Sequence, residues 1–195
     1  MAEARRNQVL PLDTATNEKM AAAQALAGGP VRDSFTFFAG TVGLFEAAAP
    51  NIKNRSFRMT ADVVLPPLGA QGVLVAMGGR FGGYSLFVRG DRLHYWYNNS
   101  GLEQTCVSTN KPLPQGRCSL GLDFSYDGGG QGKGGVVRLF VDGDCIGSGR
   151  LERTVPRIFA RETFDVGMDL NSPVADYEAP FAFNGVIERL VVHLL

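Results

Sequence analysis

The sequence predicts an all-β protein, an antiparallel sandwich of two sheets with a short N-terminal helical segment. Several runs in the 195-residue chain alternate apolar and polar residues, which is the period of a half-buried strand. Turns rich in Gly, Pro and Asn separate these runs, and no helical pattern lies between them. Strands that follow one another without intervening helices pair antiparallel, so we expect a sandwich rather than an α/β fold.

The first thirty residues differ from the rest and predict an extension, residues 1–30, that is partly helical. Thr16 can cap a short helix that continues to Ala27, and Gly28-Gly29-Pro30 would end it. Most of its helix formers are alanine, so this helix would need a surface to pack on. The β pattern begins at Val31, and we expect the sandwich to occupy residues 31–195.

Five runs with strand character follow along the chain. Most of them alternate apolar and polar residues, which distinguishes them from the turns. A fully buried strand is instead continuously apolar. The run from Gly72 is continuously apolar and is typical of a central strand. In chain order the five predicted strands are Phe57–Leu65, Gly72–Met77, Cys118–Tyr126, Val136–Val141 (followed by an Asp-Gly hairpin turn) and Gly185–Leu194.

A further hairpin can be placed in register around a two-residue turn at Gly90-Asp91. The turn pairs Arg89 with Arg92 and continues to a pair of tyrosines. Every second pair is then wholly apolar, and a slip by one residue would mix the two faces. These apolar pairs are Val88/Leu93, Leu86/Tyr95 and Tyr84/Tyr97.

The other face of this hairpin combines aromatic and polar side chains and is a candidate carbohydrate-binding surface. An aromatic ring can stack on the C–H face of a sugar, while Arg and Asn hydrogen-bond its hydroxyl groups. The alternative is that the edge of a second sheet or a partner covers this face. The candidate ligand-binding residues are Phe87, Arg89, Arg92, His94, Trp96 and Asn98.

A glycine-rich stretch, in which six of the nine residues from Asp127 to Gly135 are glycine, does not fit a phosphate-binding loop. Such a loop needs G-x-x-x-x-G-K-[ST] and opens a helix. Here Asp127 stands at the first glycine position, Gly134 replaces the hydroxyl residue, and a strand-like run follows. We expect Gly128–Gly135 to be an exposed, mobile loop that joins two strands.

The oxygen-rich stretch from Phe164 to Tyr177 is a candidate calcium site, because Ca²⁺ prefers oxygen ligands. Its spacing matches no fixed calcium loop, and Asp and Asn also cap turns, so a purely structural role stays open. No other cofactor is expected. The candidate metal ligands are Asp165, Asp169, Asn171 and Asp176, with Ser172 between them.

Three cysteines, Cys106, Cys118 and Cys145, lie at irregular spacing without a C-x-x-C motif. We expect them to be buried free thiols. A disulfide between Cys106 and Cys118 is the alternative in an oxidising compartment.

The charge composition of the chain limits the partners that we expect. Nineteen Lys and Arg balance nineteen Asp and Glu, so no overall field attracts nucleic acid or an acidic membrane. We therefore expect neither as a partner, and no stretch is long enough to span a membrane. The charged N-terminus, Met1–Arg6, has no apolar stretch behind it, which predicts no secretory signal and a cytoplasmic location.

Catalytic patterns are missing from the sequence. Glycoside hydrolysis needs paired carboxylates, yet no E-x-D-x-x-E string occurs, and Glu162 and Asp165 would lie on opposite faces of a strand. The two histidines, His94 and His193, have no triad context, and His193 is expected on a strand face. We therefore expect no enzymatic activity.

Several long stretches resemble the C-terminal domain of large bacterial arylsulfatases. They are "GVLVAMGGRFGGYSLFVRGDRLHYWYN" (72–98), "YDGGGQGKGGVVRLFVDG" (126–143), "FDVGMDLNSPVADYEAPFAFNG" (164–185) and "VIERLVVHL" (186–194). The resemblance covers residues 31–195, and "EARRNQVLPLD" (3–13) resembles the segment that closes the catalytic domain of those enzymes.

This resemblance implies a concanavalin A-like jelly roll, related to laminin-G and legume-lectin sandwiches. Sulfatases need C-x-P-x-R or S-x-P-x-R for their nucleophile, and none of the three cysteines begins such a motif. The resemblance thus implies an accessory domain without the catalytic domain. We expect a non-catalytic, lectin-like module that binds a glycan, or alternatively a structural or protein-interaction module.

Overall fold

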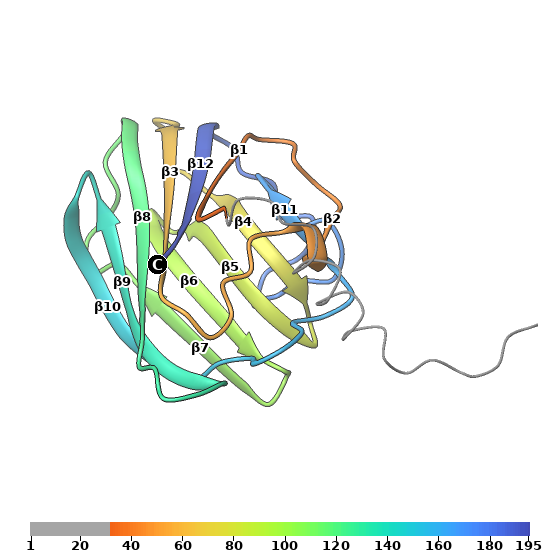
Figure 1. Cartoon of the computed structure of the whole chain (residues 1–195). Coiled ribbons are helices and arrows are strands. Elements are labelled where there is room, and N and C mark those ends of the chain that lie inside the picture. The colour runs from red at the N-terminus through yellow and green to blue at the C-terminus, as the bar shows by residue number, and fades with distance from the viewer. Residues whose placement is uncertain (1–31) are drawn as a thin grey trace, which may run out of the picture. The chain divides into compact units, whose positions relative to one another are not determined.

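We describe residues 32–195 of a computed structural model of the chain (Figure 1). The expected helical extension, residues 1–30, lies outside the described residues. Among residues 32–195, no helix is long and apolar enough to cross a membrane.

The described residues are almost entirely strands and their connections. In chain order the strands are β1 (Ser34–Phe37), β2 (Leu44–Phe45), β3 (Phe57–Leu65), β4 (Gly72–Gly79), β5 (Gly82–Arg89), β6 (Arg92–Asn99), β7 (Glu103–Ser108), β8 (Gly116–Tyr126), β9 (Lys133–Val141), β10 (Asp144–Arg153), β11 (Thr163–Val166) and β12 (Val186–Leu194), with a short 3-10 helix at Glu46–Ala48.

The strands form two six-stranded sheets. Sheet A has the order β1-β12-β3-β8-β9-β10, and sheet B has the order β2-β11-β4-β5-β6-β7. Each pair of neighbouring strands is antiparallel. The predicted fold class, an antiparallel two-sheet jelly-roll sandwich, is therefore confirmed.

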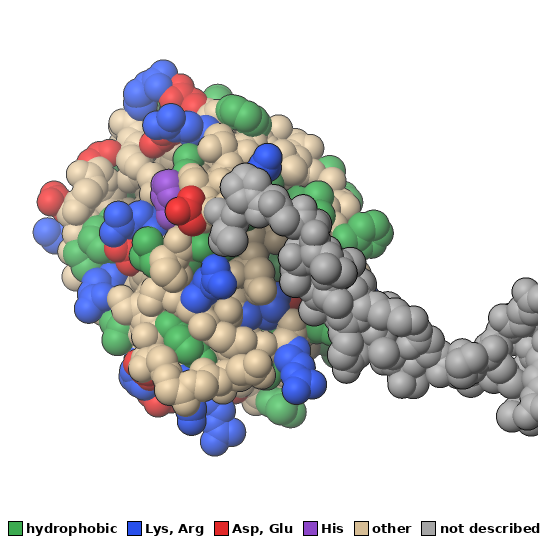
Figure 2. Space-filling view, in the orientation of Figure 1, with side chains coloured by type: hydrophobic (Ala, Val, Ile, Leu, Met, Phe, Trp, Pro, Cys, Tyr) green, Lys and Arg blue, Asp and Glu red, His purple; other side chains and the backbone are tan. Residues whose placement is uncertain are grey.

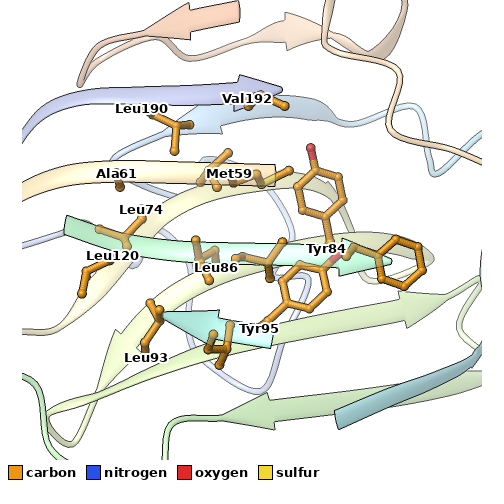
Figure 3. Packing of buried hydrophobic residues seen from close by; sticks show 14 of the residues in the cluster. Met59, Ala61, Leu74, Tyr84, Leu86, Leu93, Tyr95, Leu120, Leu190 and Val192 are labelled. Carbon is orange, nitrogen blue, oxygen red and sulfur yellow. The ribbon is translucent and has the colours of Figure 1, made fainter. Parts of the chain in front are cut away.

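The hydrophobic core lies between the two sheets, where the inward-facing side chains of both sheets meet. Figure 3 shows this layer in close view, with apolar side chains of β3, β8 and β12 next to those of β4, β5 and β6. The labelled members are Met59, Ala61, Leu120, Leu190 and Val192 of sheet A and Leu74, Tyr84, Leu86, Leu93 and Tyr95 of sheet B.

The predicted strands and the hairpin register are confirmed. β3 has the predicted bounds, and β4 is an inner strand in which every residue is buried. In the β5–β6 hairpin Tyr84 pairs with Tyr97 and Arg89 with Arg92, as the apolar pairs required. Gly90 and Asp91 both have positive φ, 58° and 56°, which is the conformation that a tight hairpin turn of this kind needs.

A long segment after β11 returns across the outer face of sheet B, and we call residues 167–183 the strap. Val174, Tyr177 and Phe181 pack with buried side chains of β4 and β5. The strap approaches β4 so closely at Gly72 that a Cβ there would lie 2.2 Å from the Ala182 carbonyl oxygen. This contact requires glycine at position 72. The φ of Gly72, +115°, is also a conformation that only glycine adopts readily.

The glycine-rich stretch joins two strands, β8 and β9, as predicted, but only its first part is an open loop. Nothing lies within 4 Å of a Cβ placed at Gly128, Gly129 or Gly130. Gly134 and Gly135, in contrast, are buried inside β9. The expectation that the whole Gly128–Gly135 segment is exposed is therefore wrong for its last two residues.

Charged side chains of both signs are interspersed over the face of the molecule shown in Figure 2. This distribution agrees with a net charge of zero and leaves no broad surface of one sign on that face.

Candidate functional site

The predicted sugar-binding face of the β5–β6 hairpin is largely closed by the strap. Phe87 is 0% exposed, and its ring centroid lies 5.1 Å from that of Tyr177, edge to face. His94 stacks on the other side of Phe87, also at 5.1 Å. The expectation of an open aromatic platform is therefore wrong at Phe87, and the cover is a segment of the same chain rather than a second sheet edge or a partner.

Asn98, another predicted ligand residue, is buried and holds two turns together. Its side-chain amide donates to the Arg80 carbonyl oxygen at 2.9 Å, and its Oδ1 accepts from the Gly101 backbone N–H at 2.8 Å. Because the NH2 group and the oxygen of this amide both form hydrogen bonds inside the protein, Asn98 links the two turns rather than offering its amide to a sugar.

The two arginines of the predicted face also have partners within the protein. Arg89 forms an ion pair with Asp176 of the strap at 2.9 Å and lies over the Phe87 ring, 5.4 Å from its centroid. Arg92 donates to the Thr109 carbonyl oxygen at 2.7 Å.

The remaining two predicted residues, His94 and Trp96, are half-buried. His94 Nδ1 lies 2.7 Å from Ser108 Oγ, and Nε2 lies 3.0 Å from the Arg89 carbonyl oxygen. Burial lowers the pKa of His94 below its ordinary value, which favours the neutral form of the ring. Trp96 Nε1 is buried without a hydrogen-bond partner among the described residues. Together with Arg89 and Arg92, these side chains do not make an open ligand surface.

The candidate calcium ligands do not converge on one point. Asp165 accepts hydrogen bonds from the Gly43 and Leu170 backbone N–H groups at 2.7 and 3.2 Å, and Asp169 accepts from the Tyr177 hydroxyl at 2.6 Å. Asp176 pairs with Arg89, and Asn171 donates to Thr163. Within residues 32–195 no three His, Cys, Asp or Glu side chains are grouped so that they could hold a metal ion. These residues therefore organise the strap in this structure, and calcium binding stays a prediction.

Asp169 illustrates this structural role. Its carboxylate lies almost fully buried and accepts from both the Tyr177 hydroxyl and the Val174 backbone N–H. Burial raises the pKa of this carboxyl above its ordinary value, and the nearby acids Asp165 and Glu162 act in the same direction. The same tyrosine hydroxyl lies 2.8 Å from Ser85 Oγ, which ties the strap to β5.

The cysteines are free, as predicted, but only one of them is buried. Cys118 lies in the interior, where burial raises the pKa of its thiol to about 11, while Cys106 and Cys145 are exposed. The expected burial is therefore wrong for Cys106 and Cys145, and the alternative disulfide is not formed.

The outer face of sheet A presents a different group of side chains, which β-sheet register brings into rows. Thr60, Gly121 and Phe140 are cross-strand partners on β3, β8 and β9. In the next row Arg58 and Asp123 are direct partners on β3 and β8. Alternation directs these side chains away from the core, since their neighbours along each strand are buried.

These rows line a hollow of about 280 Å³ that is open to solvent, and we call it the sheet A hollow. Phe140 is half-buried there, although it occupies an outward position. Gly121 leaves space beside the ring, because a Cβ at this position would lie only 3.3 Å from Phe140 Cβ. The lining residues are Arg58, Thr60, Ser119, Gly121, Asp123, Phe140 and Gly143.

An arginine–carboxylate pair supplies the strongest polar groups of the hollow. Arg58 Nε and Nη2 donate to the two carboxylate oxygens of Asp123, each at 2.6 Å. This hydrogen-bonded contact raises the pKa of Arg58, and the pair is neutral as a unit. Farther along β3, Asp62 forms an ion pair with Arg189 at 2.6 Å. His193 of β12 is exposed and is the cross-strand partner of Arg58, a strand-face position as predicted.

Sequence reasoning missed this site, although two signals mark it. Phe140 is a large aromatic residue at an outward position, between the inward Leu139 and Val141. Gly121 interrupts the alternating run of β8 where a polar side chain would be expected. A glycine inside a strand often marks a point where another group approaches closely.

No family model and no curated protein matches this sequence. Solved structures do match the fold. The K499G mutant of the NanB sialidase from Streptococcus pneumoniae aligns with a TM-score of 0.56 and 11% identity, over 81% of this chain and 26% of that chain. The CBM40 domain of the Ruminococcus gnavus IT-sialidase, bound to α2,3-sialyllactose, aligns with a TM-score of 0.53 and 14% identity, over 83% and 93% of the two chains.

Domains LG4-5 of the mouse laminin α1 chain also align, with a TM-score of 0.49 and 12% identity, over 84% of this chain and 39% of that chain. The present chain therefore spans about a quarter of the matched NanB chain and about nine tenths of the matched CBM40 domain. At these identities the likeness concerns the fold, a lectin-like jelly-roll β-sandwich.

Proposed function

We propose that this chain is a non-catalytic carbohydrate-binding β-sandwich whose ligand site is the sheet A hollow. The observation that carries the proposal is the half-buried Phe140 ring beside the Arg58–Asp123 pair. An aromatic ring next to fixed donors and acceptors is the combination that recognises a sugar, which has an apolar C–H face and a polar rim of hydroxyls.

Each group in the hollow has a role toward a pyranose ring. Phe140 offers its face to the sugar C–H groups. Arg58 retains N–H donors beyond its contact with Asp123, whose carboxylate oxygens keep free lone pairs for sugar hydroxyls. The hydroxyls of Thr60 and Ser119 can donate or accept. A volume of about 280 Å³ suits a single sugar unit at the end of a glycan.

The likeness to solved structures supports the class of ligand. The CBM40 domain that shares the fold is bound to a sialylated oligosaccharide in its structure. We take from this likeness only that a lectin-like sandwich can serve glycan binding. The identity of the sugar in the present chain depends on the residues of its own hollow.

Replacing Phe140 by alanine is expected to weaken glycan binding about tenfold or more, because the stacking surface is lost. A glycan array followed by titration calorimetry with the best ligand provides the measurement. Trp96→Ala is the matched aromatic control and should leave the affinity unchanged. Binding that survives Phe140→Ala and is lost in Trp96→Ala would instead return the site to the β5–β6 hairpin.

We also propose that the chain serves as an accessory domain of an arylsulfatase, as its sequence resemblance implies. The proposal is supported by the four stretches that resemble that domain, and the lack of C-x-P-x-R and S-x-P-x-R motifs agrees with a non-catalytic role. The purified chain is expected to hydrolyse no aryl sulfate, measured against an active arylsulfatase as positive control. Turnover that copurifies with the chain through several columns would contradict a non-catalytic role.

A further inference from the structure

One end of the sandwich carries exposed apolar side chains on three separate connections. We call this the loop end and define it as the β4–β5 turn (80–81), the β6–β7 turn (100–102) and the segment 157–161 before β11. These connections lie at the same end of the sandwich in Figure 1. Phe81 is 73% exposed, Leu102 is 89% exposed and Ile158 is 54% exposed, one on each connection.

Hydrogen bonds and close contacts hold the three connections beside one another. The buried Asn98 amide binds the Arg80 carbonyl oxygen and the Gly101 N–H, and so links the two turns. The third connection lies against the first, since a Cβ at Gly82 would approach the Phe159 carbonyl oxygen to 2.5 Å. The loop end is therefore a fixed surface, because each connection is tied to its neighbour.

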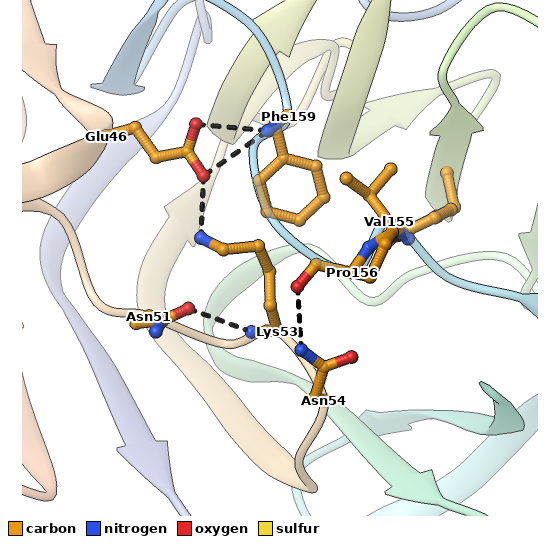
Figure 4. Close-up of polar contacts among 8 residues, drawn as sticks. Glu46, Asn51, Lys53, Asn54, Val155, Pro156 and Phe159 are labelled. Atoms are coloured by element: carbon orange, nitrogen blue, oxygen red, sulfur yellow. Dashed lines mark hydrogen bonds and ion pairs between the residues drawn. The ribbon is translucent and has the colours of Figure 1, made fainter. Parts of the chain in front are cut away.

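The third connection is also anchored by the segment that precedes β3. Glu46 accepts from the Phe159 backbone N–H at 3.0 Å and from Lys53 Nζ at 2.6 Å (Figure 4). The Lys53 ammonium lies over the Phe159 ring, 5.2 Å from its centroid. Phe159 is thus held inward while its neighbour Ile158 remains exposed.

The loop end has a local excess of exposed positive charge. Arg80, Arg157 and Arg161 are exposed, and within residues 32–195 none of them forms an ion pair. Of the nearby acids, Glu46 pairs with Lys53, Glu103 is half-buried, and Glu162 accepts hydrogen bonds from the Ser172 N–H and hydroxyl. A net charge of zero for the chain does not reveal this local arrangement.

We propose that the loop end docks on an anionic lipid bilayer surface. The three apolar tips enter the interfacial region, and the arginines meet acidic headgroups. Separate protruding tips flanked by arginine suit a deformable lipid surface, whereas a protein partner more commonly meets a continuous apolar patch. The expectation of no membrane partner rested on the net charge and on the lack of a spanning stretch, and neither describes a local surface of this kind.

Cosedimentation of the full chain with vesicles tests the proposal, using phosphatidylcholine alone and phosphatidylcholine with added phosphatidylserine. We expect binding only to the vesicles that contain phosphatidylserine, with loss of binding at high salt. Phe81→Ser and Leu102→Ser should each weaken binding, and Arg80→Gln, Arg157→Gln and Arg161→Gln should each weaken it about fivefold.

Matched controls lie at the opposite end of the β5–β6 hairpin. Leu68 is 96% exposed in the connection next to Gly69, which lies close to Asp91 of the hairpin turn, and Lys111 is exposed in the loop that follows β7. Leu68→Ser and Lys111→Gln should bind vesicles like the unaltered chain, and melting curves establish that every variant is folded.

Any of three results with vesicles would overturn the proposal. They are no binding to anionic vesicles, equal binding to both kinds of vesicle, and anionic-vesicle binding that the loop-end variants leave unchanged. A protein partner that is captured through Phe81 and Leu102 while vesicles are ignored would also overturn it, in favour of a protein interface.

Discussion

Replacing Phe87 by alanine is expected to lower the free energy of unfolding by about 3–5 kcal/mol. The ring is 0% exposed and packs against Tyr177 and Phe181 of the strap and against His94 of β6. Its removal leaves a cavity between sheet B and the strap, which the surrounding side chains fill only in part. Urea denaturation followed by circular dichroism measures the loss.

Phe81→Ala is the matched control, since Phe81 lies just before β5 but is largely exposed. This variant should change the free energy of unfolding by no more than about 0.5 kcal/mol. If Phe87→Ala were equally mild, the strap would not be packed on this face in solution. The hairpin face would then be open to a ligand, as its composition first suggested.

Replacing Gly134 by alanine is expected to lower the free energy of unfolding by about 3 kcal/mol, near the upper end of overpacking effects. A Cβ at this position would lie 2.2 Å from the Leu151 carbonyl oxygen and 2.7 Å from that of Glu152. Both atoms belong to the backbone of β10, so β9 and β10 must separate to make room.

Deletion of Gly129 is the control within the same glycine-rich stretch, because a Cβ there meets nothing within 4 Å. The deletion shortens an open loop and should change stability by a few tenths of a kcal/mol. Thermal melting of the two variants compares them directly. Equal effects would contradict the division of this stretch into a free loop and a packed strand.

The candidate sites show where reading the sequence succeeded and where it failed. The register of the β5–β6 hairpin was predictable, because the pairing of Val88 with Leu93 depends on residues that are close in the chain. The cover over Phe87 was not predictable in this way, since Tyr177 reaches Ser85 across 92 positions of sequence. Aromatic residues on an outward face suit a ligand and a covering segment equally well.

The sheet A hollow was partly visible in the sequence. Phe140 on β9 and Gly121 on β8 both occupy outward positions, where a polar side chain would be expected. The hollow forms only when β8 pairs with β9 in the register that makes Gly121 the direct partner of Phe140, and with β3 in the register that places Thr60 beside Gly121. The pairing of β8 with β3, unlike that of β8 with β9, joins strands that lie far apart in the chain, so neither residue stood out as a site member.

The sequence by itself determined the class of fold, the position of its main strands and the register of one hairpin, because alternation and turn formation depend on neighbouring residues. Only the tertiary structure decided which outward faces stay open. The strap closes sheet B over Phe87, while no segment of residues 32–195 covers sheet A around Phe140. The physical reason is that alternation separates the two faces of a strand, whereas the burial of an outward face depends on which distant segment packs against it.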